Sequence, residues 1–177
     1  PTGAQTLLFM SWALRVHDVN VISGIFEQAY DSIGNELGVP VAPVGFVWHH
    51  FRNNPPDGYD SDFLFKDDVH PTPDATALNS YVFYTELTRR DPTGMTYTYE
   101  DFSPDPALND EFTSVAWLAA GIHWRLNPDQ YAFLPTPIGP RRVLAGCSPA
   151  QPGRHMFDLK GRFVGIDEDG VRPCWSV

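Results

Sequence analysis

The first part of the chain alternates short apolar runs with one long amphipathic stretch. The segment QTLLFMSW contains the unbroken apolar run 7–10, which is typical of a parallel strand buried on both faces. In residues 18–38, apolar side chains recur at helical spacing, with Asn20 as the expected N-cap and Gly38 as the stop. Residues 39–48, VPVAPVGFVW, predict a second strand, which two prolines make short or irregular. Together these elements predict a parallel βαβ crossover.

Two more helices are predicted further along the chain. Thr72 stands at an N-cap position, Pro73 at the first helical position and Asp74 in the first turn, where the helix dipole favours a carboxylate. A second helix is expected over residues 109–126, with Asn109 as its cap. The apolar faces consist of Ala77, Leu78, Tyr81, Val82 and Thr85 in one helix, and Phe112, Val115, Ala116, Ala119 and Ile122 in the other.

From residue 128 onward, prolines and glycines divide the chain into short segments. HMFDLKGRFVGI and GIDEDGVRPCW predict β-hairpins that turn at Lys160-Gly161 and Asp169-Gly170. We therefore expect an α/β domain over residues 1–127 and a small β-rich appendage over residues 128–177.

Both cysteines, Cys147 and Cys174, lie in this appendage. If they pair, the closed loop contributes about 3–4 kcal/mol in a chain-entropy model; the alternative is two unrelated reduced thiols. The Gly- and Pro-rich tail and the abundance of Trp and Tyr favour a disulfide and a secreted protein.

Composition and charge exclude several classes of partner. Hydrophobic residues make up 42% of the 177 and charged residues 19%, as in a globular protein. The formal net charge of −10 argues against nucleic acid, which requires a basic surface, and against anionic membranes. No stretch approaches the roughly 20 apolar residues of a membrane helix. The chain opens at Pro1 without an initiator methionine, so we expect a preceding segment.

The segment between the second strand and the next helix carries the candidate chemistry. Residues 49–70 are rich in Asn, Pro, Asp and Gly, as expected of a site-bearing loop. Its end, Asp67-Asp68-Val69-His70, places an aspartate three residues before a histidine. Such an aspartate can accept a hydrogen bond from Nδ1 and orient the ring as a general base. The alternative is that the aspartates are solvated loop charges and that His70 packs on the helix start.

The ordered set of segments resembles one enzyme family. DDVHPTPDATALNSYVFYTEL is similar to the last block of the SGNH (GDSL-type) hydrolases, in which Asp-x-x-His-Pro precedes a helix. QTLLFMSWA, IFEQAYDSIGNELGVPVAPVG and DEFTSVAWLAAGIHWRL resemble neighbouring elements, so the likeness covers roughly residues 5–126. The resemblance implies a flavodoxin-like three-layer α/β/α fold and a serine esterase without a cofactor. In that mechanism His70 is the general base and Asp67 orients it, and the substrates are esters such as O-acetyl carbohydrates.

The family's nucleophile block is missing from this chain. There is no Gly-Asp-Ser, and the nearest alternative is Ser148 in RRVLAGCSPA, which a circular permutation would bring to the site. We therefore expect the C-terminal portion of a hydrolase, with the first strands of its sheet missing. An N-terminal half or another chain would supply the nucleophile and cover the open sheet edge. The alternative is a catalytically inactive module with a structural or assembly role.

Other polar and aromatic residues near the predicted loop have weaker patterns. Two histidines, three aspartates and His70 do not keep the spacing of a calcium loop or a zinc site, so no metal is expected. Trp48, His49 and Phe51 are candidate substrate-binding residues, because acyl groups and sugars pack on aromatic rings. Their alternative role is in the core beneath the site.

Overall fold

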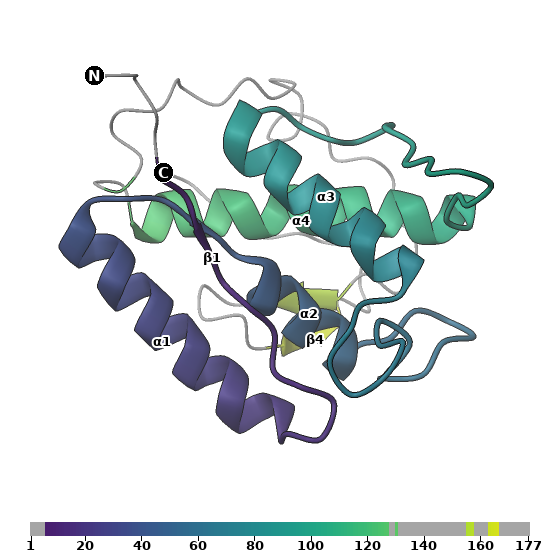
Figure 1. Cartoon of the computed structure of the whole chain (residues 1–177), viewed down its shortest axis with the longest axis horizontal. Helices are drawn as coiled ribbons and strands as arrows, with labels where there is room; N and C mark the ends of the chain where they lie inside the picture. Colours follow the sequence, from purple (N-terminus) through teal and green to yellow (C-terminus); the bar gives the residue numbers. More distant parts are fainter. Residues whose placement is uncertain (1–5, 128–129, 131–154, 158–162, 167–177) are drawn as a thin grey trace. The chain divides into compact units, whose positions relative to one another are not determined.

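The computed structural model describes residues 6–127, 130, 155–157 and 163–166. The chain divides into two compact units, Pro1–Gly139 and Pro140–Val177, and each is considered by itself. Helices dominate the described part of the first unit (Figure 1). Its elements are β1 (Leu8–Phe9), α1 (Val19–Leu37), β2 (Val41–Ala42), α2 (Val44–Asn53), α3 (Pro73–Thr88) and α4 (Pro106–Leu126).

The predicted βαβ crossover is confirmed, but the predicted fold class is wrong. β1 and β2 pair in parallel, with Leu8 opposite Val41 and Phe9 opposite Ala42. In the described part of the first unit, however, these two short strands make up the whole sheet. A mostly helical arrangement with one two-stranded parallel sheet is not a flavodoxin-like three-layer α/β/α fold.

The segment after the second strand explains much of this error. VPVAPVGFVW was expected to be extended, yet only Val41–Ala42 is a strand, and α2 begins at Val44. A continuous apolar run does not distinguish a buried strand from a buried helix. The backbone of Gly45 lies against Ser11, where an added Cβ would meet the Ser11 carbonyl oxygen at 2.1 Å. A glycine at this position therefore lets α2 start directly beneath the chain that leaves β1.

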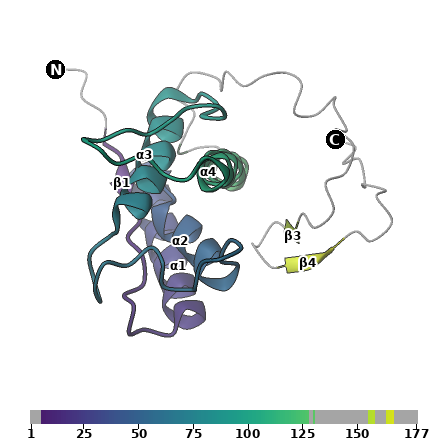
Figure 2. The same cartoon turned by 90° about the vertical axis from the view of Figure 1, so that its right-hand side faces the viewer.

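The core is formed by α2, α3, α4 and the chain segments between them. α3 buries the face predicted for it, and Thr72 caps this helix by accepting a hydrogen bond from the amide of Ala75. α3 and α4 pack directly against each other, and Figure 2 shows α3 beside α4, which is seen along its axis. The main hydrophobic cluster includes Trp48, Phe51, Leu78, Val82, Phe112 and Ala116.

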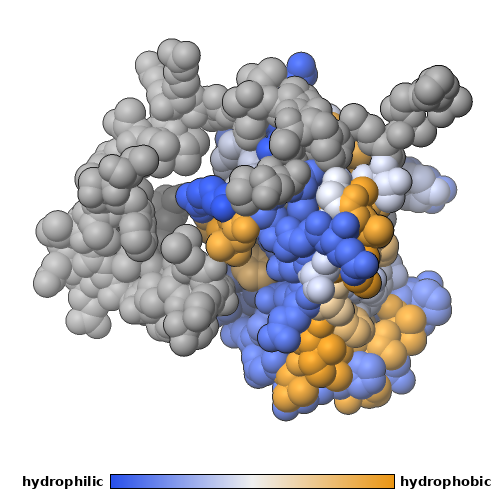
Figure 3. All heavy atoms as spheres, turned by 90° about the vertical axis from the view of Figure 1, so that its left-hand side faces the viewer, coloured by the Kyte–Doolittle hydropathy of each residue, from blue (hydrophilic) through white to orange (hydrophobic). Residues whose placement is uncertain are grey.

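α1 differs from the other helices because much of its apolar side is exposed. Its buried residues are Ser23 and Gly34, and none of its residues belongs to the main hydrophobic cluster. Apolar residues at every fourth position are exposed, and we call this row the α1 ridge: Val21, Ile25, Ala29, Ile33 and Leu37. Figure 3, which views the side on which α1 lies, shows hydrophobic patches among polar residues.

The outer edge of β1 is also open among the described residues. The amides of Leu8 and Met10 bond the carbonyls of Pro40 and Ala42 at 2.9 and 3.1 Å. Because backbone groups alternate along a strand, the N–H and C=O of Phe9 face away from β2. No described strand pairs with that edge, and the Phe9 side chain is 41% exposed.

The described part of the second unit is a pair of antiparallel strands, β3 (His155–Phe157) and β4 (Phe163–Ile166). His155 pairs with Ile166 and Met156 with Gly165, which confirms the strands of the first predicted hairpin. The second predicted hairpin, Ser148 and both cysteines of the predicted disulfide lie outside the described residues.

Candidate functional site

The loop that carries Asp67 and His70 is closed at its base by backbone contacts. Phe65 and Pro71 form an isolated antiparallel bridge. The amide of Lys66 bonds the carbonyl of His70 at 2.9 Å. One residue beyond the bridge on each side, the amide of Thr72 bonds the carbonyl of Leu64 at 2.9 Å. Since α3 begins at Pro73, the helix and the bridge together fix where the loop emerges from the core.

Within this loop the predicted contact between Asp67 and His70 is present. His70 Nδ1 lies 2.8 Å from Asp67 Oδ2 and 3.1 Å from Oδ1. Asp67 Oδ1 also accepts the backbone amides of Val69 and His70, both at 2.8 Å. The two amides, His70 first, and then the His70 ring hold the pKa of Asp67 well below its usual range.

The ionisation of Asp67 determines which ring nitrogen of His70 is available. An ionised carboxylate only accepts hydrogen bonds, so the Nδ1 that faces it carries a proton. In the neutral ring, Nε2 is then the unprotonated nitrogen that can take a proton from a hydroxyl group. The arrangement has the geometry of an acid–base pair.

The pair is open to solvent. The side chain of His70 is 72% exposed and that of Asp67 is 53% exposed. In the described part of the chain, the hydrogen bonds of the His70 ring go to Asp67 and none goes to a serine. A substrate or a further polypeptide segment therefore has free access to His70, whereas water screens the charges until something covers them.

The three candidate substrate-binding residues do not line the exposed loop. They lie on α2, where Trp48 is 1% exposed and Phe51 is fully buried in the core. Trp48 donates its indole N–H to Asn79 on α3 at 2.8 Å. His49 contacts α1, with Nε2 at 3.2 Å from Asn20 Oδ1. Trp48 and Phe51 therefore lie in the core, which is the alternative role expected for them.

Trp12, which the sequence pattern did not indicate, contacts the part of the loop between Asp67 and His70. Its Nε1–H donates to the carbonyl of Val69 at 3.2 Å. Its ring stacks on Trp48, with centroids 4.2 Å apart and planes inclined by 6°. The only sequence signal was an aromatic residue just after the first strand, where parallel strands present side chains to a site.

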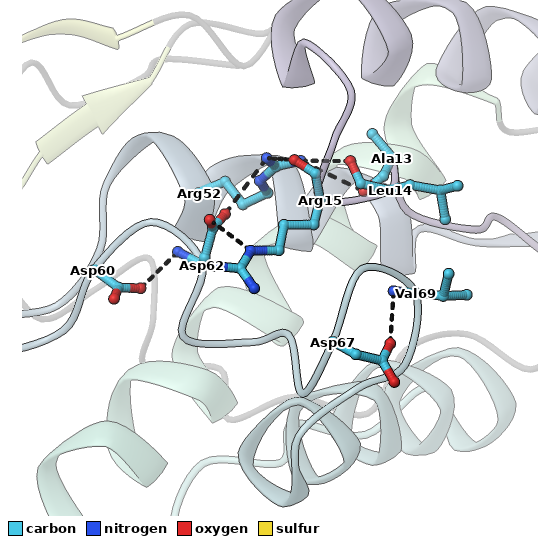
Figure 4. A network of polar contacts seen from close by, with 8 residues as sticks. All are labelled: Ala13, Leu14, Arg15, Arg52, Asp60, Asp62, Asp67 and Val69. Atoms are coloured by element: carbon cyan, nitrogen blue, oxygen red, sulfur yellow. Dashed lines mark hydrogen bonds and ion pairs between the residues drawn. The ribbon is translucent and has the colours of Figure 1, made fainter.

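A network of charged residues supports the same part of the molecule (Figure 4). Arg52 on α2 donates to the carbonyls of Leu14 and Arg15 at 3.3 and 3.1 Å and lies 3.6 Å from Asp62. Arg15 donates to Asp62 at 3.1 Å and, through its backbone amide, to the carbonyl of Asp68 at 3.1 Å. These contacts fix the chain segment after β1 against the site loop.

A second histidine–carboxylate pair lies between α1 and α4. His123 Nδ1 is 3.7 Å from Asp31 Oδ1, which is too long for a hydrogen bond. Burial lowers the pKa of His123 to about 4, while burial and the charge of Glu27 raise the pKa of Asp31 to about 6. His123 is therefore uncharged at neutral pH, and it is 4% exposed. This pair has neither the hydrogen bond nor the access that Asp67 and His70 have.

Comparison of the chain with protein-family models, curated proteins and solved structures gives no match. Across the described ranges, no group of His, Cys, Asp and Glu side chains is arranged to hold a metal ion. Within those same ranges, every helix is too short or too polar to cross a membrane.

Proposed function

We propose that this chain carries the acid–base half of a serine esterase site, as its resemblance to the SGNH hydrolases implies. The observation that supports this most directly is the binding of Asp67 to both the backbone and the ring of His70. One carboxylate thereby fixes the position of the histidine and the proton on Nδ1. Loop aspartates commonly accept a backbone amide two residues on, as Asp60 and Asp91 do, so the contact with the imidazole ring is the part that favours an acid–base pair.

The chemistry requires a serine that the described part of the chain does not present to His70. The serine oxygen attacks the ester carbonyl while His70 Nε2 takes the hydroxyl proton. The tetrahedral intermediate expels the alcohol, which receives that proton from His70. Water then attacks the acyl-serine, again through His70, and releases the acid and the free serine. An upstream segment or another chain supplies the nucleophile and oxyanion donors, and the substrates are esters such as O-acetyl groups on carbohydrate outside the cell.

The test uses the protein as its natural source produces it, with any segment or chain that accompanies it. A fluorophosphonate probe should label a serine, and the protein should hydrolyse p-nitrophenyl acetate. His70→Ala should reduce both by roughly a hundredfold or more, which is the usual contribution of a general base. Asp67→Asn should reduce them through the wrong histidine tautomer.

His17→Ala is the matched control, since His17 is an exposed histidine in another loop. Its activity should equal that of the wild type. Full activity and labelling in His70→Ala would refute the proposal.

A second candidate function, a catalytically inactive module for assembly, is favoured by the α1 ridge and the open edge of β1. Contiguous exposed apolar surface of this kind commonly marks an interface, and an unpaired strand edge accepts another strand. Under this candidate the natural protein shows no fluorophosphonate labelling, and the amide of Phe9, which faces away from β2, exchanges slowly in the assembly and rapidly in the isolated chain. Labelling that depends on His70 would exclude it.

A further inference from the structure

The two amides that bind Asp67 belong to peptide groups whose carbonyl oxygens also accept hydrogen bonds. A peptide group is planar, so the carbonyl of one residue and the amide of the next move together. The Val69 carbonyl is in the same plane as the His70 amide, and the Asp68 carbonyl is in the same plane as the Val69 amide. Both amides donate to Asp67 Oδ1 at 2.8 Å.

Both carbonyls accept hydrogen bonds from one short segment after β1. The indole N–H of Trp12 donates to the Val69 carbonyl at 3.2 Å, and the backbone amide of Arg15 donates to the Asp68 carbonyl at 3.1 Å. Each peptide plane is thus fixed at its oxygen by this segment and at its nitrogen by Asp67. A hydrogen bond to a carbonyl also polarises the peptide and strengthens its amide as a donor.

We propose that Trp12 is a positioning residue for the Asp67–His70 pair: through the Val69–His70 peptide plane it fixes the amide that holds the carboxylate. Its importance for catalysis rests on the function proposed above, but the positioning itself does not. Trp12 touches no reacting atom in this arrangement and acts only through the loop backbone.

Trp12 is suited to this role because its ring is itself held. Trp48, which is anchored to Asn79 on α3, stacks on one face of the ring. The chain that follows Trp12 is tied to α2 by Arg52, which donates to the carbonyls of Leu14 and Arg15. The loop is exposed, but through these contacts the buried core fixes its position.

Trp12→Phe tests the proposal because it keeps an aromatic ring for the stack and removes the N–H donor. In NMR experiments on the isolated chain, we expect the His70 amide, which shares a peptide plane with the Val69 carbonyl, to exchange about fivefold faster, as for the loss of one ordinary hydrogen bond. The pKa of Asp67, followed by the NMR signal of its carboxyl carbon, should move up toward the ordinary range, because the His70 amide is the first cause that lowers it.

The control is Trp117→Phe, in which the same donor is removed from a half-exposed tryptophan on α4 whose ring contacts Trp124. It should leave the Asp67 titration unchanged. An unchanged Asp67 titration in Trp12→Phe, or an equal shift in both variants, would overturn the proposal.

A measurement on the wild type keeps the test valid if Trp12→Phe does not fold. The Trp12 indole N–H should exchange more slowly than that of Trp117, and equal exchange would overturn the proposal. None of these measurements needs a substrate. A shifted Asp67 titration without esterase activity would keep the positioning role and remove the proposed function, and activity without a shift would do the reverse.

Discussion

Helices α1 and α3 both carry apolar residues at helical spacing, yet they bury them to very different extents. α3 directs Ala77, Leu78 and Val82 into the core, where each is fully buried. α1 leaves Ile25 53% exposed and Leu37 61% exposed, and faces the protein with polar or small groups such as Ser23 and Gly34. The helical period alone predicts where an apolar face lies on a helix, but the neighbours present decide whether that face is covered.

The contrast separates two kinds of attachment. α3 is held by apolar burial, which contributes roughly 25 cal/mol for each Å² removed from water. α1 is held by the close packing of Gly34, by half-buried apolar residues such as Ile22 and by polar contacts such as Asn35 with Asn127 at 3.2 Å. Contacts of the second kind contribute about 1 kcal/mol each, so we expect α1 to unfold locally before α3 does.

The largest expected difference in stability comes from replacing one leucine on α3 and one on α1. Leu78→Ala removes a fully buried side chain from α3 and should lower the free energy of unfolding by about 2–5 kcal/mol. Leu37→Ala on the α1 ridge should change it by less than about 0.5 kcal/mol. Urea denaturation of both variants measures the difference. A large loss in Leu37→Ala would show that the ridge is covered in solution.

A buried carboxyl group gives the α3 side a distinct pH dependence. Burial raises the pKa of Glu86 from 4.5 to about 8, although Trp124 donates to it at 2.9 Å. Below pH 4.5 both folded and unfolded states are protonated. As the pH rises toward 8 the unfolded state alone releases its proton, so the folded state loses stability.

Glu86→Gln should therefore raise the free energy of unfolding at pH 8 by a few kcal/mol. Each unit by which the folded protein raises the pKa of Glu86 corresponds to about 1.4 kcal/mol. The gain should disappear below pH 4.5. Thermal unfolding of both proteins across this range measures it, and a gain that does not vary with pH would contradict the assigned cause.

Two glycines of α1 distinguish its inner face from its outer one. An added Cβ at Gly34 would lie 2.7 Å from Val41 Cγ2 and 3.1 Å from the Val39 carbonyl, whereas a Cβ at Gly24 meets nothing within 4 Å. Gly34→Ala should cost about 1–3 kcal/mol through overpacking. Gly24→Ala should stabilise by about 0.5–1 kcal/mol through helix propensity. Equal effects in chemical denaturation would show that α1 does not pack with this face inward.

The smallest expected difference in stability is between substitutions of two similar N-caps, one on α1 and one on α4. Asp18 accepts the amides of Asn20 and Val21 at the start of α1, and Asp105 accepts those of Ala107 and Leu108 at the start of α4. Each change to alanine should cost about 1 kcal/mol. Hydrogen exchange should place the loss in the first turn of α1 for Asp18→Ala and in the global unfolding of the unit for Asp105→Ala. Global loss in both would remove the distinction between the helices.

Sequence patterns were informative where the deciding contacts are local. The period of α3, its cap at Thr72 and the stop at Gly38, whose φ is +61°, were predicted and are confirmed. Asn20 and Asn109 were expected as caps, but Asp18 and Asp105 hold these positions, because each places a carboxylate against two amides. Asn109 instead lies inside α4, where it bonds the Tyr81 hydroxyl and the Met95 carbonyl.

In the candidate site, too, the sequence predicts a contact between near neighbours but not contacts between distant residues. The contact of Asp67 with His70 joins residues three positions apart, so a short motif was enough to predict it. Trp12 and Val69 are 57 positions apart, and Arg15 and Asp62 are 47 apart. Nothing in the local pattern around residue 12 or residue 15 indicates these contacts, because they depend on how α2 packs beneath the chain after β1.

The bridge between Phe65 and Pro71 also makes the site loop a portable unit. Its ends meet, and the carboxylate, the imidazole and the amides that join them all come from within it. Grafted onto a hairpin of another protein, the segment would bring an oriented imidazole with it, and an indole engineered beneath the graft would supply the outside support.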